Sequence, residues 1–259
     1  MTSMKQNIIV FFVAFVSLLA VAFALQEQAA ISGPTSKILF VGNSYTFVHD
    51  VPGTLKKIAR SKGKRIDVDM AVKPGATFAE HAVDSDILNK IASEPWDYIV
   101  LQEQSQRMAW GSDQWQRDSL APAMSLVQYI RQKVPNAKIL LYSTWGRKNG
   151  DKDNCATLAD VCTYEGMQRR ITSAYGQLAA RANALVVPVG KVWQYMRQKN
   201  PTIELYEPDE THQSVAGAYL SAATFYKPLF HDSVLGAKSI GIDQDEALAI
   251  QTAVDLMAQ

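Results

Sequence analysis

Ser44 is the residue whose type and position most favour nucleophilic chemistry. It lies in the segment 42–46, Gly-Asn-Ser-Tyr-Thr, directly after the apolar run 37–41 and shortly before a helical pattern. At such a turn a serine can present its hydroxyl beside free backbone N–H groups, which suits attack on an acyl carbon. Glycine, asparagine and serine are also common turn residues, and serine caps helices, so position alone leaves a structural role open.

A nucleophilic serine needs a base, and the chain contains four histidines. His212 follows Asp209 by three residues in a polar segment, directly before a helical pattern. In a turn, this spacing lets the carboxylate reach the Nδ1–H of the imidazole and leaves Nε2 free to accept the serine proton. Because an Asp-x-x-His pair also arises by chance, it gains weight only together with Ser44. The other histidines are expected at polar surface or packed in the fold: His49, His81 and His231.

The candidate catalytic residues need a fold that brings them together. Apolar, β-branched runs predict five strands at 37–41, 66–72, 97–101, 137–142 and 184–188. Amphipathic patterns predict helices near 52–62, 78–92, 114–133, 164–183, 189–199, 214–228 and 243–257. This alternation favours an α/β fold, a three-layer α/β/α sandwich around a five-stranded, mainly parallel sheet. In such a sheet, ligands bind beyond the carboxyl ends of the strands.

Segments after the predicted strands resemble the sequence blocks of the SGNH (GDSL-type) hydrolase superfamily. The resemblance rests on segment 42–46, on Gly75 after the second strand, on segment 102–105 after the third, and on Asp209-x-x-His212. It spans about residues 37–229 and implies a flavodoxin-like fold with serine esterase activity. It also implies that Ser44 is the nucleophile, that Asp209 and His212 complete a triad, and that the N–H groups of Ser44 and Gly75 bind the oxyanion.

Two positions depart from the family pattern. Asn43 stands where the common form has aspartate, and the third block reads Gln-Glu-Gln-Ser-Gln over 102–106 where the family has Gly-x-Asn-Asp. The missing asparagine matters because one oxyanion donor contributes about 10²–10³ in rate. A glutamine amide can also donate, so Gln104 is the candidate donor, with Gln102 and Gln106 as alternatives. We expect a divergent branch in which glutamine replaces asparagine.

Tryptophans close to the predicted strand ends suggest a substrate. Trp110 and Trp115 follow the third strand, and Trp145 follows the fourth. A flat aromatic face beside polar groups suits a sugar ring, so Trp110 and Trp145 are candidate substrate contacts, while packing beneath loops is the alternative. Arg147 and Lys148 could contact an acidic sugar, but a solvated loop is the favoured explanation for them.

The amino-terminal residues differ in composition from the rest of the chain. A single basic residue, Lys5, precedes the uncharged apolar run 8–25, and Ala-Phe-Ala at 22–24 offers a cleavage site. These features predict a signal peptide over 1–24, a linker over 25–36 and one domain over 37–259. An uncleaved membrane anchor is the alternative. In an oxidising compartment Cys155 and Cys162 are expected to form a disulfide, and two thiols are too few for a structural zinc site.

The composition excludes some classes of protein and disfavours others. The 259 residues are 47% hydrophobic, which excludes a disordered chain, and 26 basic against 25 acidic residues give no electrostatic footprint for nucleic acid. We therefore expect an exported, periplasmic or secreted, serine esterase that acts on small-molecule or glycan esters and requires no metal or organic cofactor. Membrane contact is expected only if the amino-terminal segment stays uncleaved, and the oligomeric state is left open. An acyltransferase of the same fold and a non-catalytic glycan-binding module are the alternatives.

Overall fold

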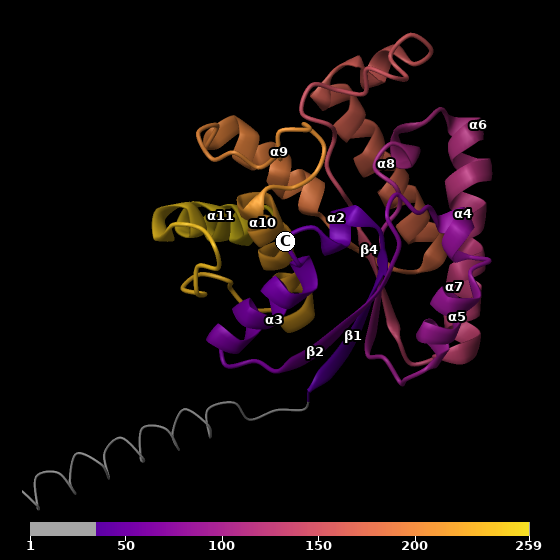
Figure 1. The fold of residues 1–259 in the computed structure, drawn as a ribbon, viewed down its shortest axis with the longest axis horizontal. Helices are drawn as coiled ribbons and strands as arrows, with labels where there is room; N and C mark the ends of the chain where they lie inside the picture. The colour runs from indigo at the N-terminus through magenta and orange to yellow at the C-terminus, as the bar shows by residue number, and fades with distance from the viewer. Residues whose placement is uncertain (1–34, 259) are drawn as a thin grey trace, which may run out of the picture.

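The computed structural model describes residues 35–258, so the predicted signal peptide and nearly all of the predicted linker lie outside the described residues. Five parallel strands form one sheet in the order β2-β1-β3-β4-β5 (Figure 1). Each strand lies within a residue or two of its predicted position, which confirms the predicted fold class. The strands are β1 (Ser36–Gly42), β2 (Ile66–Val72), β3 (Tyr98–Leu101), β4 (Lys138–Tyr142) and β5 (Leu185–Val187).

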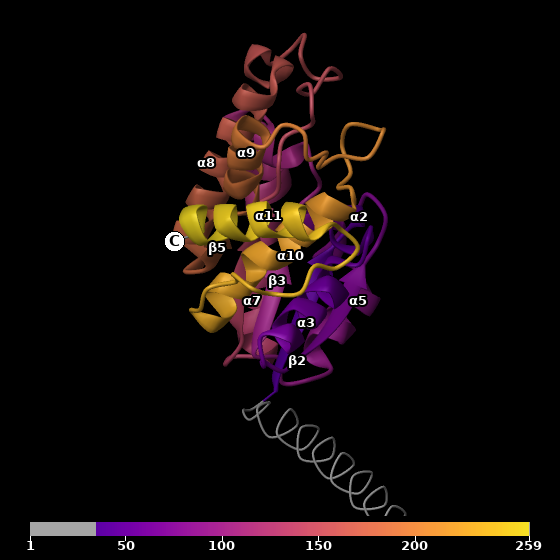
Figure 2. The same ribbon diagram turned by 90° about the vertical axis from the view of Figure 1, so that its left-hand side faces the viewer.

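Two layers of helices cover the two faces of the sheet (Figure 1). The first layer, which faces the viewer in Figure 2, contains α3 (Val51–Ser61), α9 (Val189–Lys199), α10 (Val215–Phe230) and α11 (Gln244–Met257). The second contains α4 (Phe78–His81), α5 (Ser85–Ala92), α7 (Ala121–Lys133) and α8 (Tyr164–Ala182).

Strand β1 lies at the inner part of the sheet and is buried on both faces. Ile38 and Phe40 pack in the core beneath the first helix layer, whereas Leu39 and Val41 pack beneath the second. A strand covered on both sides has no polar face, which explains why its sequence is continuously apolar instead of alternating. The edge strand β2 does alternate, and its Asp67 is exposed.

Helix boundaries differ from the predicted ones where local capping intervenes. The predicted helix 78–92 is two helices, because the Asp84 side chain accepts the N–H groups of Asp86 and Ile87 and so starts α5 anew. The predicted helix 114–133 consists of α6 (Ser112–Trp115), a π-helical turn η2 (Gln116–Leu120) and α7. Three short helices have too few residues to show a period: α2 (Ser44–Phe47), η1 (Arg107–Ala109) and η3 (Ala159–Cys162).

Cys155 and Cys162 form the predicted disulfide, which closes a short loop between β4 and α8. Among residues 35–258, no helix combines the length and apolar character needed to span a membrane.

Candidate active site

The sheet order places three candidate segments side by side at one edge. Strand β1 lies between β2 and β3, and all three run in parallel, so their carboxyl ends meet at the same edge. Ser44 follows β1 by two residues, while Gly75 and Gln104 each follow their own strand by three. The order of the strands therefore puts Ser44 between the segments that carry Gly75 and Gln104, as expected for a ligand site in an open α/β sheet.

Ser44, His212 and Asp209 form a continuous hydrogen-bonded chain. Ser44 Oγ lies 2.8 Å from His212 Nε2, and His212 Nδ1 lies 2.5 Å from Asp209 Oδ2. The other carboxylate oxygen, Oδ1, accepts the backbone N–H groups of Thr211 and His212, both at 2.9 Å. These two bonds fix the carboxylate so that Oδ2 faces the ring. With the Nδ1 proton held by Asp209, Nε2 is left to accept the proton of the serine hydroxyl.

The Asp209 side chain is ionised in this arrangement. Its partial burial would raise its pKa, but the hydrogen bonds from the His212 ring and from the N–H groups of Thr211 and His212 outweigh that effect. The pKa of Asp209 therefore lies below its ordinary value. A carboxylate that stays charged at neutral pH can stabilise a positive charge that develops on the imidazole.

The loop that carries Asp209 and His212 is attached to the segment that carries Ser44. Gln213 is fully buried, and its Nε2 donates to the carbonyl oxygens of Ser44, Tyr45 and Val48 at 3.3, 3.1 and 2.8 Å. An isolated bridge between Tyr206 and Gln213 closes the base of the loop. Sequence reasoning missed Gln213, because a polar residue beside a histidine gives no sign that its amide is buried.

The backbone N–H groups of Ser44 and Gly75 have no hydrogen-bond acceptor among the described residues. Ser44 is the first residue of α2, so its N–H has no acceptor within the helix. Gly75 adopts a φ of +66°, which residues other than glycine rarely adopt, and this conformation sets the direction of its N–H. Asn43 holds the two loops together, since its Nδ2 donates to the Ala76 carbonyl at 2.9 Å. Both N–H groups can bind an anion.

The three glutamines after β3 differ in what their amide groups contact within residues 35–258. Gln102 is buried and donates both hydrogens, to Asn43 Oδ1 at 3.0 Å and to the Glu103 carbonyl at 2.5 Å. The amide of Gln106 faces the carboxylate of Asp151, at 2.9 and 3.0 Å. Gln104 uses one hydrogen on Gln106 Oε1 at 3.2 Å and has a second to donate. Gln102 therefore has no amide hydrogen left and Gln106 turns its amide to Asp151, so Gln104 is the preferred candidate donor to an oxyanion.

Glu103 is a further buried residue at this edge that sequence reasoning did not single out. Its Oε1 accepts the N–H of Phe78 at 2.9 Å and that of Gln104 at 2.7 Å, so it ties the segment after β2 to the segment after β3. Its Oε2 is buried, with no hydrogen-bond partner in the part of the chain that the structure describes. Burial raises the pKa of Glu103 to about 7, although the two N–H groups oppose that rise.

Trp145 does not contact solvent and is wrong as a predicted substrate contact. It is fully buried and stacks between Tyr45 and Trp193, at centroid distances of 4.6 and 4.0 Å. Its Nε1 donates to the Thr211 carbonyl at 3.0 Å, and the Tyr45 hydroxyl donates to Thr211 Oγ1 at 3.2 Å. Trp145 therefore packs behind the residues that flank Ser44 and His212, because a large apolar ring next to a core strand is drawn into the core.

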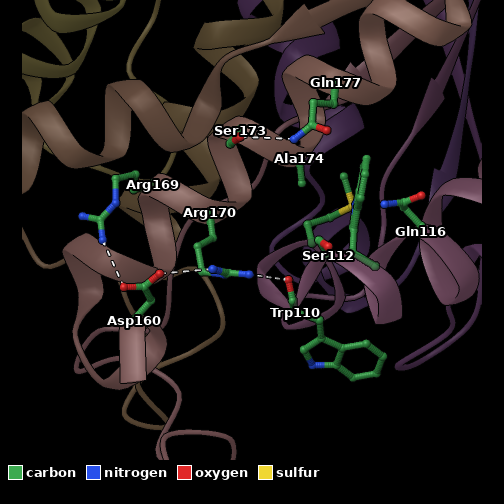
Figure 3. A pocket seen from close by; sticks show the side chains of 11 residues that line it. Trp110, Ser112, Gln116, Asp160, Arg169, Arg170, Ser173, Ala174 and Gln177 are labelled. Carbon is green, nitrogen blue, oxygen red and sulfur yellow. Dashed lines mark hydrogen bonds and ion pairs between the residues drawn. The ribbon is translucent and has the colours of Figure 1, made fainter. Parts of the chain in front are cut away.

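Trp110 is half-buried and lines a separate cavity of about 280 Å³ between α6 and α8 (Figure 3). Arg170 donates to its carbonyl at 2.8 Å, and the Arg107 guanidinium lies over its ring at 4.7 Å. The residues that line this cavity do not include Ser44, Asp209 or His212. A role of Trp110 in substrate binding stays a prediction.

The remaining histidines lie outside the hydrogen-bonded chain. His49 pairs with Glu207 through Nε2, at 2.5 Å from Oε1, and His231 ends α10 in a left-handed conformation. His81 is fully buried, and burial lowers its pKa. Among residues 35–258, no group of three or more histidine, cysteine or acidic side chains is arranged to hold a metal ion.

No family model matches the chain, and no curated protein matches its sequence. Solved structures do resemble it. A DUF4886 family protein from Bacteroides uniformis is 21% identical, with 85% of this chain and 93% of that one covered and a TM-score of 0.72. A proposed SGNH hydrolase from Slackia heliotrinireducens is 25% identical, with coverages of 76% and 100% and a TM-score of 0.61. The acetyl xylan esterase AlAXEase is 15% identical, with coverages of 75% and 100% and a TM-score of 0.56. The fold is thus that of SGNH hydrolase structures, and these neighbours include esterases of low sequence identity.

Proposed function

We propose that the chain is an exported serine esterase that hydrolyses carboxylic esters. The observation that carries the proposal is the series of hydrogen bonds from Ser44 Oγ through His212 to Asp209, together with the N–H groups of Ser44 and Gly75, which lack acceptors within residues 35–258. A serine, a base and an anion site within one cluster are the components that acyl transfer requires.

Acylation would begin with attack of Ser44 Oγ on the carbonyl carbon of the ester, while His212 Nε2 takes the hydroxyl proton. Asp209 stabilises the imidazolium that forms. The oxyanion of the tetrahedral intermediate accepts hydrogen bonds from the N–H groups of Ser44 and Gly75 and from the Gln104 amide. Collapse of the intermediate breaks the bond to the alcohol, which leaves with the proton from His212. The product is an acyl group on Ser44.

Deacylation repeats these steps with water as the nucleophile. His212 takes a proton from the water that attacks the acyl carbon, and the same donors bind the second oxyanion. The acid leaves, and the proton on His212 returns to Ser44 Oγ. This cycle needs neither a metal ion nor an organic cofactor.

The proposed substrates are O-acetyl or other short acyl esters, with carbohydrate esters as the first class to test. The similarity in fold to an acetyl xylan esterase supports that choice. The disulfide between Cys155 and Cys162 supports the proposed export, since such bonds persist in oxidising compartments.

Two substitutions test the proposal on an activated ester such as p-nitrophenyl acetate. Ser44→Ala and His212→Ala should each lower kcat by at least about 10³-fold, and Ser44→Ala should abolish labelling by a fluorophosphonate probe. His49→Ala is a matched control, because His49 also pairs with an acidic side chain but has no serine at its other nitrogen. It should retain the wild-type rate. A wild-type chain that neither reacts with the probe nor releases acetate would favour a non-catalytic binding module.

A further inference from the structure

Asp151 is a buried carboxylate outside the proposed triad. It lies in the β4–α8 loop (residues 143–163), shortly before Cys155, with 1% of its surface exposed. Gln106 Nε2 donates to its two oxygens at 2.9 and 3.0 Å, Asn154 Nδ2 donates at 2.7 Å, and Arg147 Nη1 donates at 3.3 Å. Because these donors include a cation and two amides, the buried charge is well satisfied.

The carboxylate of Asp151 determines the orientation of the side-chain amides of Gln106 and Gln104. A carboxylate can only accept hydrogen bonds, so Gln106 must present its NH₂ group to Asp151 and its oxygen to the other side. That oxygen accepts a hydrogen bond from Gln104 Nε2 at 3.2 Å, and the Gln106 backbone N–H donates to Gln104 Oε1 at 2.8 Å. Gln104 is therefore held at both ends of its amide, with Nε2 in a fixed orientation and one hydrogen left to donate.

Contacts within the β4–α8 loop hold Asp151 in place. Its backbone N–H donates to the Val161 carbonyl at 2.7 Å, and its side chain accepts the Asn154 amide. Asn154 precedes Cys155, and Val161 precedes Cys162, so the disulfide joins the direct neighbours of the two residues that contact Asp151.

We propose that Asp151 is a positioning residue that orients the Gln104 amide in the oxyanion hole by way of Gln106. The inference rests on the proposed esterase function. An oxyanion donor acts on the transition state more than on the bound substrate, so its misalignment lowers kcat and leaves KM nearly unchanged.

The first test compares substitutions along this path on the activated ester. Asp151→Ala and Gln106→Ala should each lower kcat about tenfold to hundredfold, with KM within about twofold of the wild-type value. Asp151→Asn should recover part of that loss, since asparagine keeps one acceptor oxygen for Gln106. Asp153→Ala is the matched control, because Asp153 shares the loop and the Arg147 ion pair but is 72% exposed. Its rate should not change.

A double-mutant cycle separates orientation of Gln104 from general damage. In a Gln104→Ala background, Asp151→Ala should lower kcat by less than about twofold further, because the donor that it positions is already absent. If Asp151→Ala does not fold, judged by its thermal unfolding, Gln106→Ala replaces it in the cycle. Equal losses in both backgrounds, with an active wild type, would overturn this inference alone. A wild-type chain without Ser44-dependent hydrolysis would overturn the proposed function and this role of Asp151 together.

Discussion

The two halves of the candidate site are built differently. On the side of Ser44, the polar residues that hold the loops are buried, with Asn43 and Gln102 at most 2% exposed. On the opposite side, the side chains of Asp209 and His212 are 48% and 31% exposed, and they lie on a surface loop. The nucleophile side thus resembles a folded core with polar contacts, whereas the base lies on a loop that the core anchors through Gln213.

This difference predicts which substitutions change the catalytic rate without changing the stability of the fold. Removing a partner from a buried polar network leaves another group unsatisfied, which costs about 1–3 kcal/mol of stability. Exposed charge pairs contribute about 0–1 kcal/mol. Changes on the exposed loop should therefore affect the rate with little effect on stability, whereas changes on the buried side should affect both.

The largest expected effect is that of Asp209→Asn on the rate. Asparagine keeps an oxygen for the N–H groups of Thr211 and His212 but cannot hold the imidazole in the tautomer that accepts the serine proton. We expect kcat on an activated ester to fall by about 10⁴-fold. The free energy of unfolding in urea should change by less than about 0.5 kcal/mol. Glu207→Gln, on the same loop and paired with His49, is the control that should retain the rate. A rate loss of less than tenfold would contradict the assignment of Asp209.

On the buried side, the titration of Glu103 should be visible in stability. Its pKa is raised from 4.5 to about 7 by burial, so between these pH values the folded chain holds a proton that the unfolded chain releases. The free energy of unfolding should therefore decrease as pH rises from about 4.5 to 7, by at most about 3 kcal/mol. Glu103→Gln should remove this decrease, measured by urea unfolding at several pH values. The exposed control, Glu165→Gln, should retain it. Stability that rises with pH equally in wild type and Glu103→Gln would count against a protonated Glu103.

The sequence predicted the sheet and the larger helices because their apolar periods are strong and local. The spacing of Asp209 and His212 is local as well, and it led to a pair that the fold brings to Ser44. Burial of a polar side chain has no local signal, since it depends on which loops meet in three dimensions. For this reason Gln213 and Glu103 were not foreseen.

Trp145 shows that local sequence also fails to predict the burial of an aromatic side chain. The prediction for Trp145 failed because its position after β4 fits both a rim residue and a core residue, and only the stacking on Tyr45 and Trp193 distinguishes the two. The choice among three glutamines after β3 likewise depended on the partners Asn43 and Asp151, which are distant in sequence.

Gln213 connects the two halves, so its substitution should give the smallest effect on rate together with a measurable effect on stability. Gln213→Met keeps the volume but removes the donor to three carbonyl oxygens of the Ser44 segment. We expect a loss of about 1–2 kcal/mol in urea unfolding. We also expect a fall of about tenfold in kcat, because the distance between His212 and Ser44 becomes less well fixed.

Gln251→Met is the matched control for this last comparison. Gln251 is also a buried glutamine, but its amide donates to the Tyr219 hydroxyl and the Ala237 carbonyl, which belong to the packing of α10 and α11. It should lose a similar amount of stability and keep the wild-type kcat. If both variants lose stability and rate equally, the loss of rate reflects a weakened fold. If only Gln213→Met loses rate, the buried amide of Gln213 keeps His212 at hydrogen-bonding distance from Ser44.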